Sequence, residues 1–110
     1  MKVIFEPEVQ EYLDRLIPVL YEKGYFGFVD AAIKYVDDLI DDIQSNLHEK
    51  RHKRPPDRYK KYGKDIHYAA FTKNKRTTWY AFFTKYQNEN NEIIYLIRYI
   101  GNNHTYAQYL

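Results

Sequence analysis

The chain has 110 residues, enough for one domain but too few for two stable cores, and 45% of them are hydrophobic, which argues against disorder. It has no cysteine, which excludes disulfides and thiolate metal sites. The net charge of +2 conceals a division: residues 1–47 hold four Lys or Arg against ten Asp or Glu, a net −6, whereas residues 48–110 hold thirteen against five, a net +8. This asymmetry indicates a basic face suited to nucleic acid or to an acidic partner protein.

The N-terminus shows a three-residue apolar run before its first acid, which is too short for a signal peptide. No apolar run approaches the roughly 18 residues that a membrane helix requires. We therefore expect a cytoplasmic protein with no membrane partner.

The acidic half of the chain predicts a strand and two helices. Residues 2–5 (KVIF) have the β-branched and aromatic composition of a strand. Apolar residues at helical spacing from Val9 to Leu20 predict a helix, and Pro18 should kink or end it near Ile17. Two glycines within residues 21–30 then indicate a helix stop and a connection.

A second helix is expected from Asp30 to Leu47, because apolar residues recur there at helical spacing and form one apolar stripe. Its acids Asp37, Asp38, Asp41 and Asp42 share the opposite face. Carboxylates at this spacing can bind metal, but a solvated helix face explains them better, and we assign no metal site.

Residues 48–64 form a basic loop, with eight Lys or Arg against two acids and a Pro-Pro pair. Lys and Arg neutralise phosphates, and the tyrosines of this loop could stack on bases. The alternatives are a solvated loop or a dock for an acidic protein segment. The candidate nucleic-acid-binding residues are Lys50, Arg51, Lys53, Arg54, Arg58, Lys60, Lys61 and Lys64, with Lys73 beyond the loop.

Three strands are expected after the loop, at residues 66–72, 76–86 and 93–100. Their short connections favour antiparallel hairpins. Both faces of the runs 79–83 and 93–100 are apolar, which is typical of central strands. The predicted fold is α+β, with the order β-α-α-β-β-β and two helices packed on one small antiparallel sheet in a single domain, residues 1–110.

The final strand and the residues after it carry candidate catalytic groups. RNA can be cleaved without metal when a base takes the proton of the 2′-hydroxyl and a cation stabilises the charge at phosphorus. His104 has a reference pKa of roughly 6.5, which suits proton transfer. Tyr106 or Tyr109 could donate a hydrogen bond, and Arg76 and Arg98 could hold phosphate. The alternative is a packed terminus in which Arg98 is an edge residue.

The segments KVIFEPEV, RTTWYAFF and IIYLIRYIGNNHTYAQY, in this order around two helices and a basic connection, resemble the RelE/ParE superfamily of bacterial toxins. The family's strand motif opens with arginine, whereas here Arg76 precedes the matching stretch 78–82 by two or three positions. Asn102 and Asn103 stand where the family often has basic residues, and Tyr109 matches a C-terminal tyrosine.

The resemblance implies a β-α-α-β-β-β fold and the toxin of a type II toxin–antitoxin system. Many relatives of this kind are endoribonucleases that cut messenger RNA on the ribosome, and they need no cofactor. The implied partners are a cognate antitoxin, the ribosome and messenger RNA. Two alternatives stay open: a non-catalytic inhibitor of DNA gyrase, as in the ParE branch, and a degenerate binding module.

Overall fold

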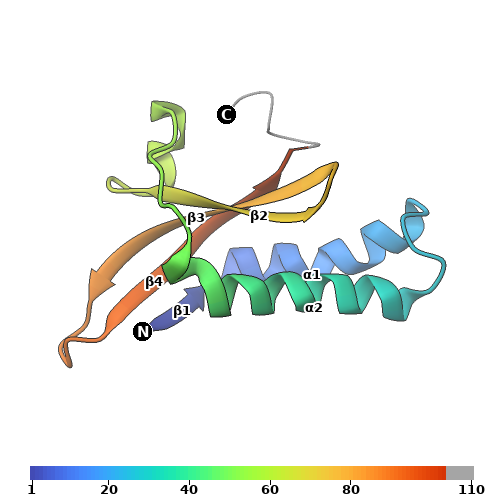
Figure 1. The fold of residues 1–110 in the computed structure, drawn as a ribbon, viewed down its shortest axis with the longest axis horizontal. Coiled ribbons are helices and arrows are strands. Elements are labelled where there is room, and N and C mark those ends of the chain that lie inside the picture. The colour runs from blue at the N-terminus through green and yellow to red at the C-terminus, as the bar shows by residue number, and fades with distance from the viewer. Residues whose placement is uncertain (104–110) are drawn as a thin grey trace.

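In the computed structural model of the protein, residues 1–103 are described. They form, in chain order, β1 (Lys2–Phe5), α1 (Pro7–Glu22), α2 (Val29–Asn46), the short 3₁₀ helices η1 (Leu47–Glu49) and η2 (Asp57–Tyr62), then β2 (His67–Asn74), β3 (Thr77–Gln87) and β4 (Ile93–Asn102). Figure 1 shows both α-helices on one face of the sheet, with the chain between α2 and β2 crossing to the other face. The α+β class expected from the sequence is confirmed.

The sheet has the strand order β1-β4-β3-β2. β2, β3 and β4 form an antiparallel meander, but β1 pairs with β4 in parallel, with Lys2 opposite Ile94 and Phe5 opposite Ile97. The expected wholly antiparallel sheet was therefore wrong, and the sheet is mixed. The reason is topological: two helices and two hairpins separate β1 from β4, so no tight turn sets their relative direction. β3 and β4 lie in the centre, as their two apolar faces indicated.

Helix α1 does not end at its proline. Pro7 occupies its first turn, where a missing N–H costs nothing, and the helix continues through Pro18 to Glu22. Pro18 is exposed, so the carbonyl that loses its N–H partner can be hydrated, and Leu20 beyond it still packs against the core. Of the two effects expected of Pro18, an end of the helix near Ile17 was wrong, because tertiary contacts of the last turn outweigh the proline, whereas a kink stays a prediction.

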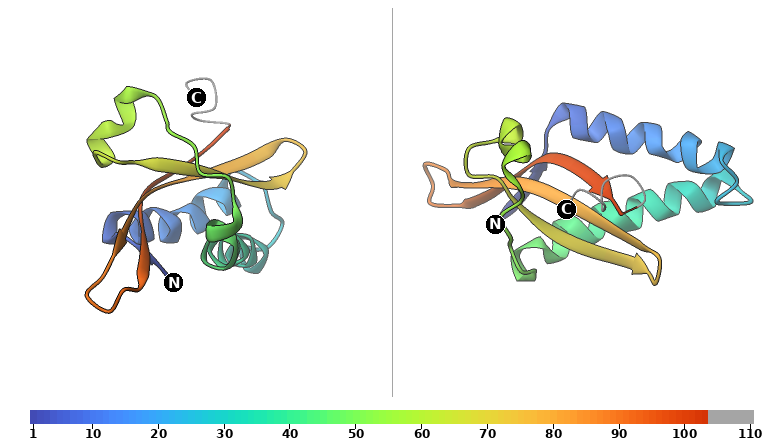
Figure 2. Two further views of the ribbon diagram at one scale, coloured as in Figure 1. Left: turned by 60° about the vertical axis from the view of Figure 1, so that its left-hand side comes forward. Right: turned by 90° about the horizontal axis from the view of Figure 1, so that it is seen from above.

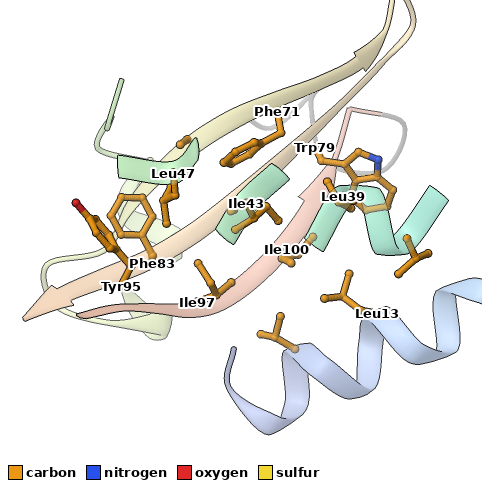
Figure 3. Close-up of a cluster of buried hydrophobic side chains, with 14 of the residues drawn as sticks. Leu13, Leu39, Ile43, Leu47, Phe71, Trp79, Phe83, Tyr95, Ile97 and Ile100 are labelled. Carbon is orange, nitrogen blue, oxygen red and sulfur yellow. The ribbon is translucent and has the colours of Figure 1, made fainter. Parts of the chain in front are cut away.

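The main core lies between the helices and the inner face of the sheet (Figure 3). Leu13 of α1 and Leu39 and Ile43 of α2 are fully buried against Phe71 and Ile97 of the sheet. Burying each such side chain contributes about 1.5–3 kcal/mol. No helix among the described residues is both long and apolar enough to cross a membrane.

Trp79 makes a polar contact across this interface. The indole Nε1 of Trp79, a residue only 2% exposed, donates a hydrogen bond of 2.8 Å to the hydroxyl oxygen of Tyr35 on α2. The bond fixes α2 against β3. It also gives the buried indole N–H an acceptor that it would otherwise lack.

We predict that Tyr35→Phe lowers the free energy of unfolding by about 1–3 kcal/mol, because it leaves the Trp79 N–H without an acceptor. Denaturant unfolding followed by circular dichroism measures the change. Tyr25→Phe is the control, since Tyr25 is 64% exposed and water can reach its hydroxyl in both the folded and the unfolded protein. Equal effects of the two substitutions would contradict this role of the hydrogen bond.

Candidate nucleic-acid interface

A second, smaller core lies on the outer face of the sheet, the face turned away from the helices. Tyr59 and Ile66 of the chain between α2 and β2 are buried there against Phe82 of β3. The ring of Tyr59 stacks on that of Phe82, with centroids 4.7 Å apart and planes 14° from parallel. Residues 48–66 are called the basic segment below, and these contacts hold its second half, from Tyr59 to Ile66, on the outer face of the sheet (Figure 2, left).

The sequence of the basic segment explains this placement. Pro56 precedes η2, and its carbonyl accepts a hydrogen bond from the N–H of Tyr59. A 3₁₀ helix has three residues per turn, so Tyr59 and Tyr62 lie on the same side of η2. Both tyrosines contact the sheet, whereas Arg58 and Lys61 are exposed.

Half-buried tyrosines surround this outer core. Tyr62 of the basic segment stacks on Tyr99 of β4, with centroids 4.6 Å apart and planes 13° from parallel. Tyr68 packs on Phe82 at 5.4 Å and meets Tyr80 edge to face at 5.9 Å. Such partly exposed rings are surfaces on which unpaired bases can stack.

Cations lie directly beside these rings. The guanidinium of Arg58 lies 5.0 Å from the centroid of Tyr59, and the ammonium of Lys61 lies 5.2 Å from that of Tyr62. Lys60 is partly neutralised by Asp57, at 3.3 Å, while Lys64 is exposed nearby. The combination of exposed cations and aromatic faces can bind a single-stranded nucleic acid through both its phosphates and its bases.

Three further contacts anchor the basic segment. Lys53 and Tyr68 exchange two backbone hydrogen bonds, of 2.9 and 2.8 Å. The Nε2 atom of His52 lies 2.8 Å from the carbonyl oxygen of Leu47, and its ring meets Phe83 edge to face. At Gly63 the backbone approaches β3 so closely that a Cβ atom would lie 2.7 Å from Cγ2 of Thr84.

We predict that Gly63→Ala destabilises the protein by about 1–3 kcal/mol, because the added methyl group overlaps a β-branched side chain on a central strand. Thermal unfolding measures the loss. Gly27→Ala is the matched control, since a Cβ at Gly27 would meet no atom within 4 Å. If both variants unfold at the same temperature as the native chain, the close approach at Gly63 is refuted.

Arg98 lies at an irregularity of β4. Phe82 pairs with Tyr99 and Phe83 with Ile97, so Arg98 is the extra residue of a β-bulge, a feature that redirects a side chain. Its side chain is 31% exposed, and its Nη1 atom lies 3.7 Å from the position of a Cβ at Gly63. The bulge therefore places Arg98 at the margin of the basic segment.

Glu6 neutralises Arg98 in part. The Nε atom of Arg98 lies 2.8 Å from Oε1 of Glu6, but its buried N–H is not directed at any acceptor within residues 1–103. We therefore regard the contact as an ion pair without a good hydrogen bond. The Glu6 backbone is also tied to β4, because its N–H donates to the carbonyl oxygen of Ile97. The pair joins the start of α1 to the bulge.

We predict that Glu6 and Arg98 are coupled by about 1 kcal/mol, between the values of exposed and of buried pairs. Unfolding free energies of Glu6→Gln, Arg98→Met and the double variant form the cycle that measures this coupling. If the two single effects simply add, the ion pair does not stabilise the junction.

The structure does not bring the two candidate catalytic arginines together. Arg76 is exposed in the β2–β3 turn, where its carbonyl oxygen accepts a 2.7 Å hydrogen bond from the side chain of Asn103. Asn103 follows Arg98 by five residues, which is roughly 16 Å along a strand. Asn103 also exchanges two hydrogen bonds with the backbone of Thr78, so its amide holds the end of β4 to the turn.

The remaining candidates are divided among three places. His104, Tyr106 and Tyr109 lie outside the described residues. Lys50 and Lys73 lie toward the helix side, 5.2 Å from the ring of Phe71 and 5.0 Å from that of Tyr35. The exposed cations of the basic segment are Arg51, Lys53, Arg54, Arg58, Lys60, Lys61 and Lys64.

Sequence reasoning did not identify Glu6, Gly63 or the tyrosines of β2, β3 and β4 as parts of this site. The alternation Trp79, Tyr80, Ala81, Phe82 was a usable signal, because apolar side chains on both faces of a strand require cover on both. Glu6 offered no such signal, since its partner is 92 positions away in the chain.

The acids of α2 form a solvated face. Lys34 donates a 2.9 Å hydrogen bond to Asp38, which lowers the pKa of that carboxyl below its ordinary value, and Asn46 donates to Asp42. In the part of the chain that the structure describes, no three His, Asp or Glu side chains are grouped so as to hold a metal ion.

Comparisons of the chain with protein-family models, with curated proteins and with solved structures found no match.

Proposed function

We propose that the protein is the toxin of a type II toxin–antitoxin system, similar to the RelE/ParE superfamily, and that it binds and cleaves messenger RNA on the ribosome. The observation that carries the proposal is the outer face, where the exposed Lys61 lies over Tyr62 and the ring of Tyr62 stacks on that of Tyr99. This is the composition of a surface for single-stranded RNA.

Cleavage would proceed without metal. The 2′-oxygen of RNA attacks the adjacent phosphorus, its proton passes to a base, and the 5′-oxygen leaves with a proton from an acid. Arg98, beside this face, would stabilise the negative charge that develops on the phosphate oxygens. By resemblance, His104 would transfer protons, Tyr106 or Tyr109 would orient the nucleotide, and Arg76 would bind phosphate farther along the RNA.

The proposed antitoxin is a protein with an acidic segment. The net charge of +8 over residues 48–110 favours such a partner, and an acidic segment could compete with RNA for the exposed cations of the basic segment. Neutralisation would then be competition for one surface.

A second candidate function is RNA binding without cleavage, as in a degenerate member of the same family. Two observations favour it: Glu6 already occupies one side of Arg98, and Arg76 lies about five strand residues away from it. A binding module needs neither arginine to be available to phosphate.

RNA binding tests the outer face directly. We predict that replacing Arg58, Lys61 and Lys64 by alanine together weakens binding of a short poly(U) RNA and lowers the slope of log affinity against log salt by about 2, at roughly 0.7 per lost phosphate contact. Fluorescence anisotropy across a salt series measures both.

The control triple variant replaces three exposed lysines outside the basic segment, Lys2, Lys34 and Lys85, and so removes the same charge. If the control loses as much affinity and slope, the binding is a general effect of net charge and the outer face is not the site.

Cleavage distinguishes the two candidate functions. In a translation reaction with purified ribosomes, we predict that the native chain cuts messenger RNA and that Arg98→Ala and His104→Ala reduce cutting by about 100-fold or more. RNA binding with intact messenger RNA would favour the binding module. Inhibition of DNA gyrase with intact messenger RNA would contradict the ribonuclease and favour the ParE-like alternative.

A further inference from the structure

A second candidate site lies on the other side of the molecule, between the helices and one end of the sheet. It is a pocket of about 730 Å³ between the C-terminal half of α1, the connection to α2 and the ends of β2, β3 and β4. In Figure 1 the helical hairpin extends beyond this end of the sheet. The volume falls within the range of small-molecule sites.

The walls of the pocket are rich in aromatic rings. Five of its lining residues are aromatic: Tyr12, Tyr25, Phe26, Tyr35 and Trp79. Phe26 and Tyr35 pack against each other with centroids 5.3 Å apart, and the Trp79 N–H is already bonded to the Tyr35 hydroxyl. A ligand therefore need not supply an acceptor for the indole N–H. The rings offer surfaces on which a planar group can pack.

The charge of the pocket is opposite to that of its surroundings. Residues 1–47 carry ten acids and only four Lys or Arg, yet two of those four, Arg15 and Lys23, line the pocket. Lys73 joins them from β2, 5.0 Å from the ring of Tyr35. None of the described lining residues is Asp or Glu. Arg15 is already paired with Glu11 on the same helix, so the positive charge offered to a ligand comes mainly from Lys23 and Lys73, and it indicates that the ligand is an anion.

Asn74 and Asn102 also line the pocket, and the side-chain oxygen of Asn74 accepts a 2.9 Å hydrogen bond from the N–H of Arg76. Amides both donate and accept hydrogen bonds, as the edges of heterocyclic bases do. Aromatic walls, amides and cations without carboxylates match the three parts of a nucleotide: a flat face, a polar edge and a phosphate.

We propose that this pocket binds a free nucleoside monophosphate, with the base packed among the aromatic rings and the phosphate held by Lys23 and Lys73. The site lies on the helix side of the sheet, opposite the outer face, so an RNA strand on that face does not occupy it. The proposal is independent of the function proposed above.

The chain contains one tryptophan, and it lines this pocket, so its fluorescence reports occupancy. The native chain is titrated with AMP, GMP, CMP and UMP, and calorimetry repeats each titration. We expect at least one nucleotide to change the Trp79 emission and to saturate. The same nucleoside without phosphate, and ribose 5-phosphate without a base, should each bind at least tenfold more weakly.

Variants locate the site. Lys23→Met and Lys73→Met should each weaken nucleotide binding about tenfold, because each removes a charge-assisted contact while keeping the aliphatic stem. Lys34→Met is the matched control, since Lys34 is an exposed lysine of the same half that does not line the pocket. The Lys34→Met variant should bind the nucleotide with the same affinity as the native chain.

Three outcomes would overturn the proposal. The first is the absence of saturable binding by either method for all four nucleotides. The second is equal binding of ribose 5-phosphate, which would show attraction to phosphate alone. The third is a Trp79 response to a synthetic peptide of alternating Asp and Leu but not to nucleotides, which would assign the pocket to an acidic protein partner.

Discussion

The stacking of Tyr59 on Phe82, with Ile66 beside them, is the contact on which the outer face depends. Residues 48–64 carry eight Lys or Arg, whose mutual repulsion and solvation favour an extended chain. Two buried side chains of the basic segment and the close approach at Gly63 overcome this tendency. As a result, the backbone that carries these cations is held near the sheet (Figure 2), with Arg58 beside Tyr59 and Lys61 beside Tyr62.

The central strand β4 connects this face to the rest of the fold. It pairs with β3 on one side and with β1 on the other, and its bulge directs Arg98 toward Glu6 at the start of α1. At its far end, Asn103 holds the β2–β3 turn. One strand thus fixes the position of the candidate phosphate-binding arginine and separates it from Arg76. Within residues 1–103, the two candidate arginines therefore lie at different positions, Arg98 on β4 and Arg76 in the β2–β3 turn.

Local patterns predicted those elements whose evidence is local. The apolar stripe of α2 and the two apolar faces of β3 and β4 indicated a buried helix and central strands, and both are present. The parallel pairing of β1 was not predictable, because its partner lies about 90 residues away and no turn constrains it. Pro18 was misjudged for a related reason: the cost of a proline is local, but the packing of Leu20 that offsets it is not.

The candidate site, too, was predictable from the sequence only where its evidence is local. The cations of the basic segment could be found from composition, whereas their platform requires knowing that η2 turns Tyr59 and Tyr62 toward the sheet. Lys73 has the right charge but contacts Tyr35 on the helix side, and only the tertiary structure shows that it belongs to a different surface. Charge could therefore be assigned from the sequence, but the face on which each charge lies could not.

The most direct test of the account is to map RNA contacts on the isotope-labelled protein by NMR, with a poly(U) oligonucleotide that lacks a terminal phosphate. We predict that the largest amide shifts fall on residues 58–64 and on Arg98 and Tyr99, while the solvent face of α2 stays unchanged. Shifts confined to the helix side, or none at RNA concentrations that saturate anisotropy, would contradict the claim that the outer face of the sheet is the nucleic-acid interface.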